Sequence, residues 1–174
     1  IENQKLNHPK YIRDPIHDII KIEDEVILEL IDSCPFQRLK HIKQLPFGFY
    51  VYPGATHTRF LHSLGVYYLA TRLLDRLEIK DEEDRLVVKI AALMHDIGKL
   101  TMLKIFENKY WEFTPEEKKE MRKHPELGEK ILENSRTISE IVRQIIMQHH
   151  ERQDGTGYPN GLLGDNSDPL RSNF

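Results

Sequence analysis

The feature that most constrains this chain is a nearly all-round apolar run, LVVKIAALM at residues 86–94, that leads directly into His95 and Asp96. Acidic residues from Asp81 onward suit a helix N-terminus, so we predict one helix over residues 81–98. A helix that is apolar on all sides has to be buried at the centre of the fold. An ionised carboxylate at its end costs on the order of several kcal/mol unless a cation compensates it. Asp96 therefore predicts a salt bridge or a metal ion, and the adjacent imidazole favours the metal.

A structural explanation, in which His95 and Asp96 only end the helix before Gly98, has about equal weight from these residues alone. The pair His149-His150 changes that balance. Apolar residues lead to each of these histidines in steps of four, so both imidazoles are predicted to extend the core-facing stripe of a helix. Inward-facing imidazoles need partners for their nitrogens, and a metal ion is one such partner. The alternative, one core histidine and one exposed, is less favoured beside a second His/Asp cluster.

Six residues are the candidate metal ligands: His62, His95, Asp96, His124, His149 and His150. His62 and His124 taken singly would be surface or capping histidines. The remaining four histidines are interpreted as structural or solvated, with His57 left open: His8, His17, His41 and His57. Imidazoles with one carboxylate suit two divalent first-row ions, with Fe or Mn preferred and Zn, Co or Ni as alternatives.

A carboxylate can bridge two such ions, which lower the pKa of a bridging water and clamp phosphoryl oxygens. The predicted catalytic residues are Asp96, Lys99 and Arg59, because attack on phosphorus needs positive charge on the developing oxyanion. A cation that satisfies a helix C-terminus is an equally weighted explanation of Lys99.

The rest of the chain predicts an all-α helical bundle. Helices are predicted over 25–31, 36–44 and 62–77, and capping boxes at Thr114–Glu117 and Thr137–Glu140 open two more. Pro125 is predicted to break the helix that His124 ends. The aromatic segment 46–54 is predicted as a short hairpin or loop, and 14–22 as a strand or irregular segment.

Composition narrows the function classes. A length of 174 residues suits a single domain, here predicted over residues 1–174. The net charge of −3 argues against a dedicated nucleic-acid binder but leaves a nucleotide substrate open. Cys34 is the only cysteine, which fits a cytoplasmic protein without an internal disulfide, and no apolar run reaches the length of a membrane span.

The motifs resemble the HD phosphohydrolase superfamily in two ways. The pieces DPIHD, LIDSCPFQRLKHIKQL and YPGATHTRFLHSLGVYYLA, within residues 12–70, look like its deoxynucleoside triphosphate triphosphohydrolases. This resemblance implies that His62 is a metal ligand and that Gln44 and Arg59 contact the substrate. It also places Asp32 and Gln37 where such enzymes sense a guanine nucleotide, although Lys40 replaces the expected arginine.

The second resemblance covers residues 86–164. The pieces ALMHDIGKL, KHPELGEKIL and HHERQDGTGYPNGLLG look like the HD-GYP phosphodiesterases that act on cyclic di-GMP. It implies that His95, Asp96, His124, His149 and His150 bind metal. It further implies that Lys99 contacts phosphate and that the loop 154–159, with Tyr158 as a substrate-binding residue, shapes the site.

Two departures keep alternatives open. GKLTML follows His-Asp where the triphosphohydrolase pattern has further catalytic histidines. Both patterns also continue to a final metal-binding Asp on a later helix. Asp165 and Asp168 lie in a loop-like segment, so we expect a domain that is truncated at its C-terminus. The leading hypothesis is a phosphodiesterase that cleaves a cyclic dinucleotide.

The alternatives are a dNTP triphosphohydrolase and a catalytically impaired nucleotide- or metal-binding module. Assembly into a homo-oligomer is left open.

Overall fold

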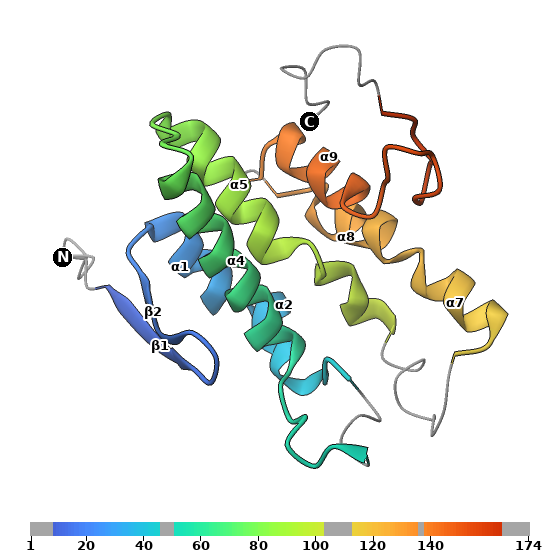
Figure 1. The fold of residues 1–174 in the computed structure, drawn as a ribbon, viewed down its shortest axis with the longest axis horizontal. Coiled ribbons are helices and arrows are strands. Elements are labelled where there is room, and N and C mark those ends of the chain that lie inside the picture. Colours follow the sequence, from blue (N-terminus) through green and yellow to red (C-terminus); the bar gives the residue numbers. More distant parts are fainter. Residues whose placement is uncertain (1–8, 46–50, 103–112, 136–137, 165–174) are drawn as a thin grey trace.

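The computed structural model describes residues 9–45, 51–102, 113–135 and 138–164. Helices make up most of it, and a small two-stranded sheet lies at one edge (Figure 1). The elements in chain order are β1 (Lys10–Asp14), β2 (Asp18–Ile22), α1 (Glu25–Asp32), α2 (Cys34–Arg38), the 3-10 helix η1 (Leu39–His41), α4 (Arg59–Arg76), α5 (Glu82–Met94), the 3-10 helix η2 (Ile97–Met102), α7 (Pro115–Met121), α8 (His124–Leu132) and α9 (Glu140–Gln148). The predicted helical bundle is confirmed.

Helix α5 lies at the centre of the bundle, as its apolar sequence predicts. It packs against α4 on one side and α9 on the other, and α4 and α5 run next to each other in Figure 1. Leu93 and Met94 are buried in the core. The predicted extent of 81–98 is wrong at its C-terminal end, because the α-helix stops at Met94. The chain then turns at His95 and Asp96 and continues as η2, so both residues sit where two helices meet.

The N-terminal part forms a hairpin and short helices. Strands β1 and β2 pair antiparallel, so the predicted segment 14–22 contains strand β2 and the turn before it, and its first residue ends β1. Ser33 caps α2 through its side chain, and the single helix predicted over 36–44 is wrong. Helix α2 ends at Arg38 and η1 follows.

Helix α4 begins three residues earlier than predicted. Thr58 accepts the backbone N–H of Leu61 and caps the helix, which places His62 in its first turn. Leu64 is buried, whereas Leu73 and Leu77, at similar helical spacing, are more than half exposed.

The C-terminal helices correct three further predictions. The Thr114–Glu117 capping box is present, but α7 ends at Met121, so His124 begins α8 instead of ending the preceding helix. Pro125 lies in the first turn of α8, where its missing N–H costs nothing. Helix α9 begins at Glu140 and is capped by Ser139, not by Thr137, which lies outside the described residues.

The apolar stripe of α9 is narrower than predicted. Val142 and Ile146 are buried, but Ile141 is 54% exposed. Helix α9 ends at Gln148, so His149 and His150 occupy the turn after the helix, where both lie beside the buried His124.

Some predictions fall partly or wholly outside the described residues. Residues 46–50 of the aromatic segment are among them, as are Asp165 and Asp168. Within the described ranges, none of the helices has the length and apolar character needed to cross a membrane.

Candidate metal centre

Asp96 lies at the centre of the candidate site and faces histidines from three parts of the chain. Its side chain is 2% exposed. Its Oδ2 lies 3.6 Å from Nε2 of His95 and 3.9 Å from Nε2 of His62. Its Oδ1 lies 3.6 Å from Nε2 of His124. The two oxygens of one carboxylate therefore point toward two different groups of imidazoles.

The first group, which we call cluster one, consists of His62, His95 and Asp96. One ligand atom from each lies within 4.8 Å of the other two. His62 comes from the first turn of α4, and the other two come from the turn that ends α5. Packing of α4 on α5 brings these two points of the chain together.

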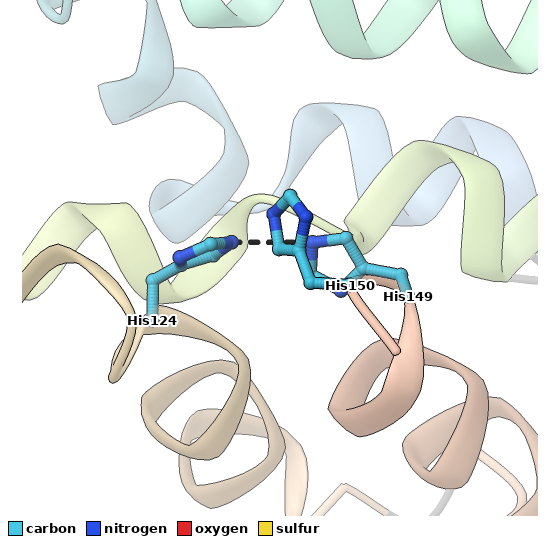
Figure 2. A group of neighbouring side chains, drawn as sticks. All are labelled: His124, His149 and His150. Carbon is cyan, nitrogen blue, oxygen red and sulfur yellow. Dashed lines mark hydrogen bonds between the residues drawn. The ribbon is translucent and has the colours of Figure 1, made fainter. Parts of the chain in front are cut away.

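The second group, cluster two, consists of His124, His149 and His150, and its ligand atoms also lie within 4.8 Å of one another. Figure 2 shows the three rings converging from the start of α8 and the end of α9. Nε2 of His124 lies 3.1 Å from Nε2 of His149. The rings of His95 and His149 are 5.3 Å apart at their centroids, so the two clusters adjoin.

Backbone carbonyls fix the orientation of three imidazoles. Each Nδ1 lies at hydrogen-bonding distance from the carbonyl oxygen three residues earlier: His95 with Ala92 at 2.9 Å, His124 with Met121 at 2.7 Å and His149 with Ile146 at 2.6 Å. A carbonyl only accepts, so Nδ1 carries the proton in each ring and Nε2 keeps its lone pair. His124 and His149 therefore face each other with two lone pairs at 3.1 Å, an arrangement that a shared cation would stabilise.

Two glycines allow α8 to approach the end of α5. A Cβ on Gly98 would lie 1.9 Å from the carbonyl oxygen of His124, and one on Gly128 would lie 3.4 Å from the backbone nitrogen of Gly98. Only a residue without a side chain fits at position 98. This close packing of η2 on α8 places His124 beside Asp96.

Two buried cations also contact Asp96. Arg59 donates from a terminal guanidinium nitrogen to Oδ2 at 2.8 Å, and Lys99 donates to Oδ1. Both side chains are at least nine-tenths buried. The salt bridge anticipated from the sequence is thus present, and it lies within the same group of side chains as the imidazoles.

Burial keeps the histidines of the site neutral. It lowers the pKa of His95 to about 4, that of His124 to about 3 and that of His150 to about 4. The pKa values of His62 and His149 are lowered for the same reason. Neutral imidazole is the form that binds metal ions.

The charge state of Asp96 and Lys99 follows from their contact. Burial alone would raise the pKa of Asp96, but the adjacent imidazole of His95 and the cations Lys99 and Arg59 outweigh it and hold that pKa below its usual range. Burial lowers the pKa of Lys99, and Asp96 opposes that shift. The site therefore holds an ionised carboxylate among neutral imidazoles.

The loop after α9 covers one side of cluster two. The ring of Tyr158 stacks on that of His150 at 4.5 Å and an angle of 21°. The carboxylate of Glu151 anchors the C-terminal part of this loop, because it accepts the backbone N–H of Asn160 at 2.6 Å and that of Leu162 at 2.9 Å. Tyr158 was predicted from the sequence and Glu151 was not, although Glu151 directly follows the His149-His150 pair.

The other predicted residues have different surroundings. Gln44 donates its backbone N–H to His57, and its side-chain oxygen is buried with no hydrogen-bond partner among the described residues. Asp32 pairs with Lys10, and the side-chain amide of Gln37 donates to the carbonyl of Ile31. Within the described part of the chain, no hydrogen bond or ion pair links Asp32 or Gln37 to the centre.

Two histidines outside the candidate ligand set, His17, which was interpreted as structural or solvated, and His57, which was left open, lie near cluster one. His17 and His57 line a cleft of about 460 Å³ that also includes His62. The ring of His17 packs on Tyr68 at 4.9 Å, which agrees with a structural role.

The comparisons with known proteins agree with this geometry. The family model described as HD domain matches residues 59–172. The chain belongs to the HD domain family. The predicted membership of the HD superfamily is confirmed, and the matched region contains all six candidate ligands.

Individual relatives are longer proteins. The deoxynucleoside triphosphate triphosphohydrolase SAMHD1 of Bos taurus is 46% identical over 107 residues, covering 58% of this chain and 18% of its own length. The Bacillus subtilis protein YwfO is 43% identical over 101 residues, covering 55% of this chain and 23% of its own. Among solved structures, a Bacteroides thetaiotaomicron phosphohydrolase aligns with a TM-score of 0.61 and 28% identity, over 81% of this chain and 34% of that one. The chain thus spans about a fifth to a third of the length of these relatives.

Proposed function

We propose that this chain is a metal-dependent phosphohydrolase that acts on a nucleotide and binds two divalent ions at clusters one and two. The observation that carries the proposal is the placement of Asp96, whose two carboxylate oxygens face different imidazole groups at 3.6–3.9 Å. One carboxylate so placed suits a bridge between two ions. Membership of the HD domain family and the phosphohydrolase names of relatives support this activity.

The donor set fits first-row divalent ions. It consists of neutral imidazole nitrogens and one carboxylate, a combination that suits Fe and Mn, with Zn, Co and Ni as alternatives. In His95, His124 and His149 the backbone carbonyl contacts hold the free nitrogen toward the cluster before any ion binds. When bound, the ions supply a water of lowered pKa and polarise the phosphoryl oxygens.

The chain's own residues provide the remaining functions. Asp96 lies between the two clusters and contacts both, while Arg59 and Lys99 place two positive charges beside its carboxylate. In a buried site these charges stabilise the negative charge that develops on the phosphoryl oxygens. Tyr158 offers an aromatic face beside His150, and Gln44 offers a buried amide oxygen, so both are proposed to contact the substrate.

The proposed substrate is a deoxynucleoside triphosphate. This choice rests on the relatives named deoxynucleoside triphosphate triphosphohydrolase and on the motifs within residues 12–70. A second candidate is a cyclic dinucleotide, cleaved at its phosphodiester bond. It is favoured by a specific observation, the three-histidine cluster two with Tyr158 stacked on His150.

Elemental analysis followed by a substrate panel tests the proposal. The purified chain, loaded with Mn or with Fe under reducing conditions, is expected to bind two ions per molecule. It is then expected to release inorganic triphosphate from dNTPs. Release of linear dinucleotide from cyclic di-GMP, with dNTPs intact, would replace the first substrate by the second. Tight nucleotide binding without turnover would instead indicate an impaired binding module, and absence of bound metal would overturn the proposal.

A further inference from the structure

Arg122 lies at the edge of cluster two, and the proposed machinery does not use it. It is the C-cap of α7, two residues before His124. Its guanidinium lies 5.3 Å from the centroid of the Tyr158 ring. That ring in turn stacks on the imidazole of His150, which lies beside His124 in Figure 2. A row of planar groups thus connects an arginine to a candidate metal ligand.

The surroundings of Arg122 leave its charge accessible. The residue is exposed. None of the ion pairs between described residues involves its guanidinium, which contacts Tyr158 instead. The neighbouring Lys123, by contrast, pairs with Glu120 at 2.5 Å. An arginine packed against an aromatic ring keeps its donors free at the edge, where a planar fork can bind a phosphate with two hydrogen bonds.

Arg122 is exposed, whereas Arg59 and Lys99 are buried, and this difference indicates which phosphate of the substrate Arg122 would bind. Arg59 and Lys99 are buried against Asp96, where the reacting phosphoryl group has to meet the metal ligands. Arg122 lies farther out, beside the ring that covers His150. A phosphate held by Arg122 is therefore a different phosphate of the same substrate.

We propose that Arg122 is a substrate-binding residue that recognises a second, non-reacting phosphate, so the site selects nucleotides that carry at least two phosphate groups. The inference rests on the proposed function, and Tyr158 acts as the platform that orients the guanidinium. Both a nucleoside triphosphate and a cyclic dinucleotide carry such a phosphate. A simple phosphodiester such as bis(p-nitrophenyl) phosphate does not.

Kinetics with two substrates test the proposal. Arg122→Gln is expected to raise KM for the best nucleotide about tenfold, which corresponds to one charge-assisted hydrogen-bond pair, and to leave kcat within about twofold. Its hydrolysis of bis(p-nitrophenyl) phosphate and its metal content are expected to stay at the wild-type level. Lys123→Gln is the matched control, because it removes the same charge one residue away and is expected to leave KM for the nucleotide unchanged.

A double-mutant cycle tests the role of the ring. Tyr158→Leu is expected to raise KM for the nucleotide as well, and combining it with Arg122→Gln is expected to add less than the product of the two single effects. Strictly multiplicative effects would contradict a shared platform.

The other outcomes are separable. If the wild-type chain hydrolyses neither substrate, the proposed function fails. Binding of inorganic tripolyphosphate to the Mn-loaded protein then tests Arg122 by itself, with about tenfold weaker binding expected for Arg122→Gln. Equal losses on both substrates, or loss of metal in Arg122→Gln, would show that Arg122 only braces Tyr158. An unchanged KM for the nucleotide would overturn the inference.

Discussion

Clusters one and two bring comparable ligands together but compensate charge in different ways. Cluster one contains the carboxylate of Asp96, and two buried cations, Arg59 and Lys99, neutralise it within the protein. Cluster two consists of three imidazoles, and its nearest contact with that carboxylate is His124 Nε2 to Asp96 Oδ1 at 3.6 Å. Its ring nitrogens face one another, with 3.1 Å between His124 and His149.

The difference shows how each cluster depends on its surroundings. Cluster one is held by charge pairing between α4 and the end of α5. Cluster two is held by backbone carbonyls, by the contact of Gly98 with α8, and by the loop that Glu151 anchors. We therefore expect changes at Asp96 to affect both clusters and changes at the packing contacts to affect cluster two alone.

The largest effect is expected from Asp96→Asn. The substitution removes the carboxylate that, among the described residues, faces both clusters, and it takes a negative charge away from the buried Arg59 and Lys99. Breaking such a buried pair costs about 3–5 kcal/mol in the free energy of unfolding. Metal stoichiometry is expected to fall from two to zero, measured by elemental analysis alongside denaturant unfolding.

Asp24→Asn serves as the control for this experiment. Asp24 pairs with the largely buried Lys89 at 2.9 Å, so its loss removes a comparable ion pair outside the centre. This variant is expected to lose stability and keep both ions. Retention of two ions in Asp96→Asn would show that the carboxylate does not join the clusters.

A smaller and more local effect is expected from Gly98→Ala. The added Cβ would lie 1.9 Å from the carbonyl oxygen of His124, so η2 and α8 have to separate. Overpacking of this kind costs about 1–3 kcal/mol. Cluster two is expected to lose its ion while cluster one keeps one, which metal titration measures. Gly54→Ala, where a Cβ would meet no atom within 4 Å, is expected to change neither stability nor metal content.

The pH dependence of stability tests the neutral state of His124 in the metal-free protein. His124 has a pKa of about 3 in the folded chain, well below the ordinary value near 6.5. The unfolded chain therefore binds more protons between these values, and this histidine lowers stability as pH falls below about 6.5. One group of this kind contributes a slope of up to about 1.4 kcal/mol per pH unit.

His124→Gln is expected to flatten the loss of stability between pH 6.5 and 4, measured by urea unfolding at several pH values. The substitution at the exposed His41, His41→Gln, is the surface control. An identical slope in His124→Gln and the wild-type chain would contradict the neutral, buried state of His124.

The smallest effect is expected from Glu151→Gln. The carboxylate accepts two backbone N–H groups of the loop, and its replacement by an amide weakens both bonds by about 1 kcal/mol together. Metal affinity at cluster two is expected to fall severalfold and that at cluster one to stay constant. Glu133→Gln replaces an exposed glutamate at the end of α8 and is expected to have no effect on either cluster.

Several parts of this fold and site could be predicted from the sequence because their signals are local. The apolar run before His95 predicted a central helix, and the Thr114–Glu117 box marked the start of α7 correctly. The helix boundary after Met94, the cap at Ser139 and the exposure of Ile141 were not predicted. These features depend on which neighbouring segments each helix packs against. Thr137 and Ser139 are equally suitable cap residues by sequence, and the rows that contain Ile141 and Val142 are equally apolar.

The residue types of the site can be read from the sequence alone: a carboxylate at the end of a buried helix, one adjacent pair of imidazoles with further single histidines, and a loop rich in glycine. A buried carboxylate needs a compensating cation, and buried imidazoles need partners for their nitrogens. Both needs follow from the sequence before the structure is known. Which imidazoles face which oxygen of Asp96 follows from the tertiary structure, because His62, Asp96, His124 and the His149-His150 pair are separated in the sequence and meet through the packing of α4, α5, α8 and α9. Arg122, Glu151 and Gly98 acquire their significance only there, since contacts with Tyr158, the loop backbone and His124 arise from close packing that no local pattern records.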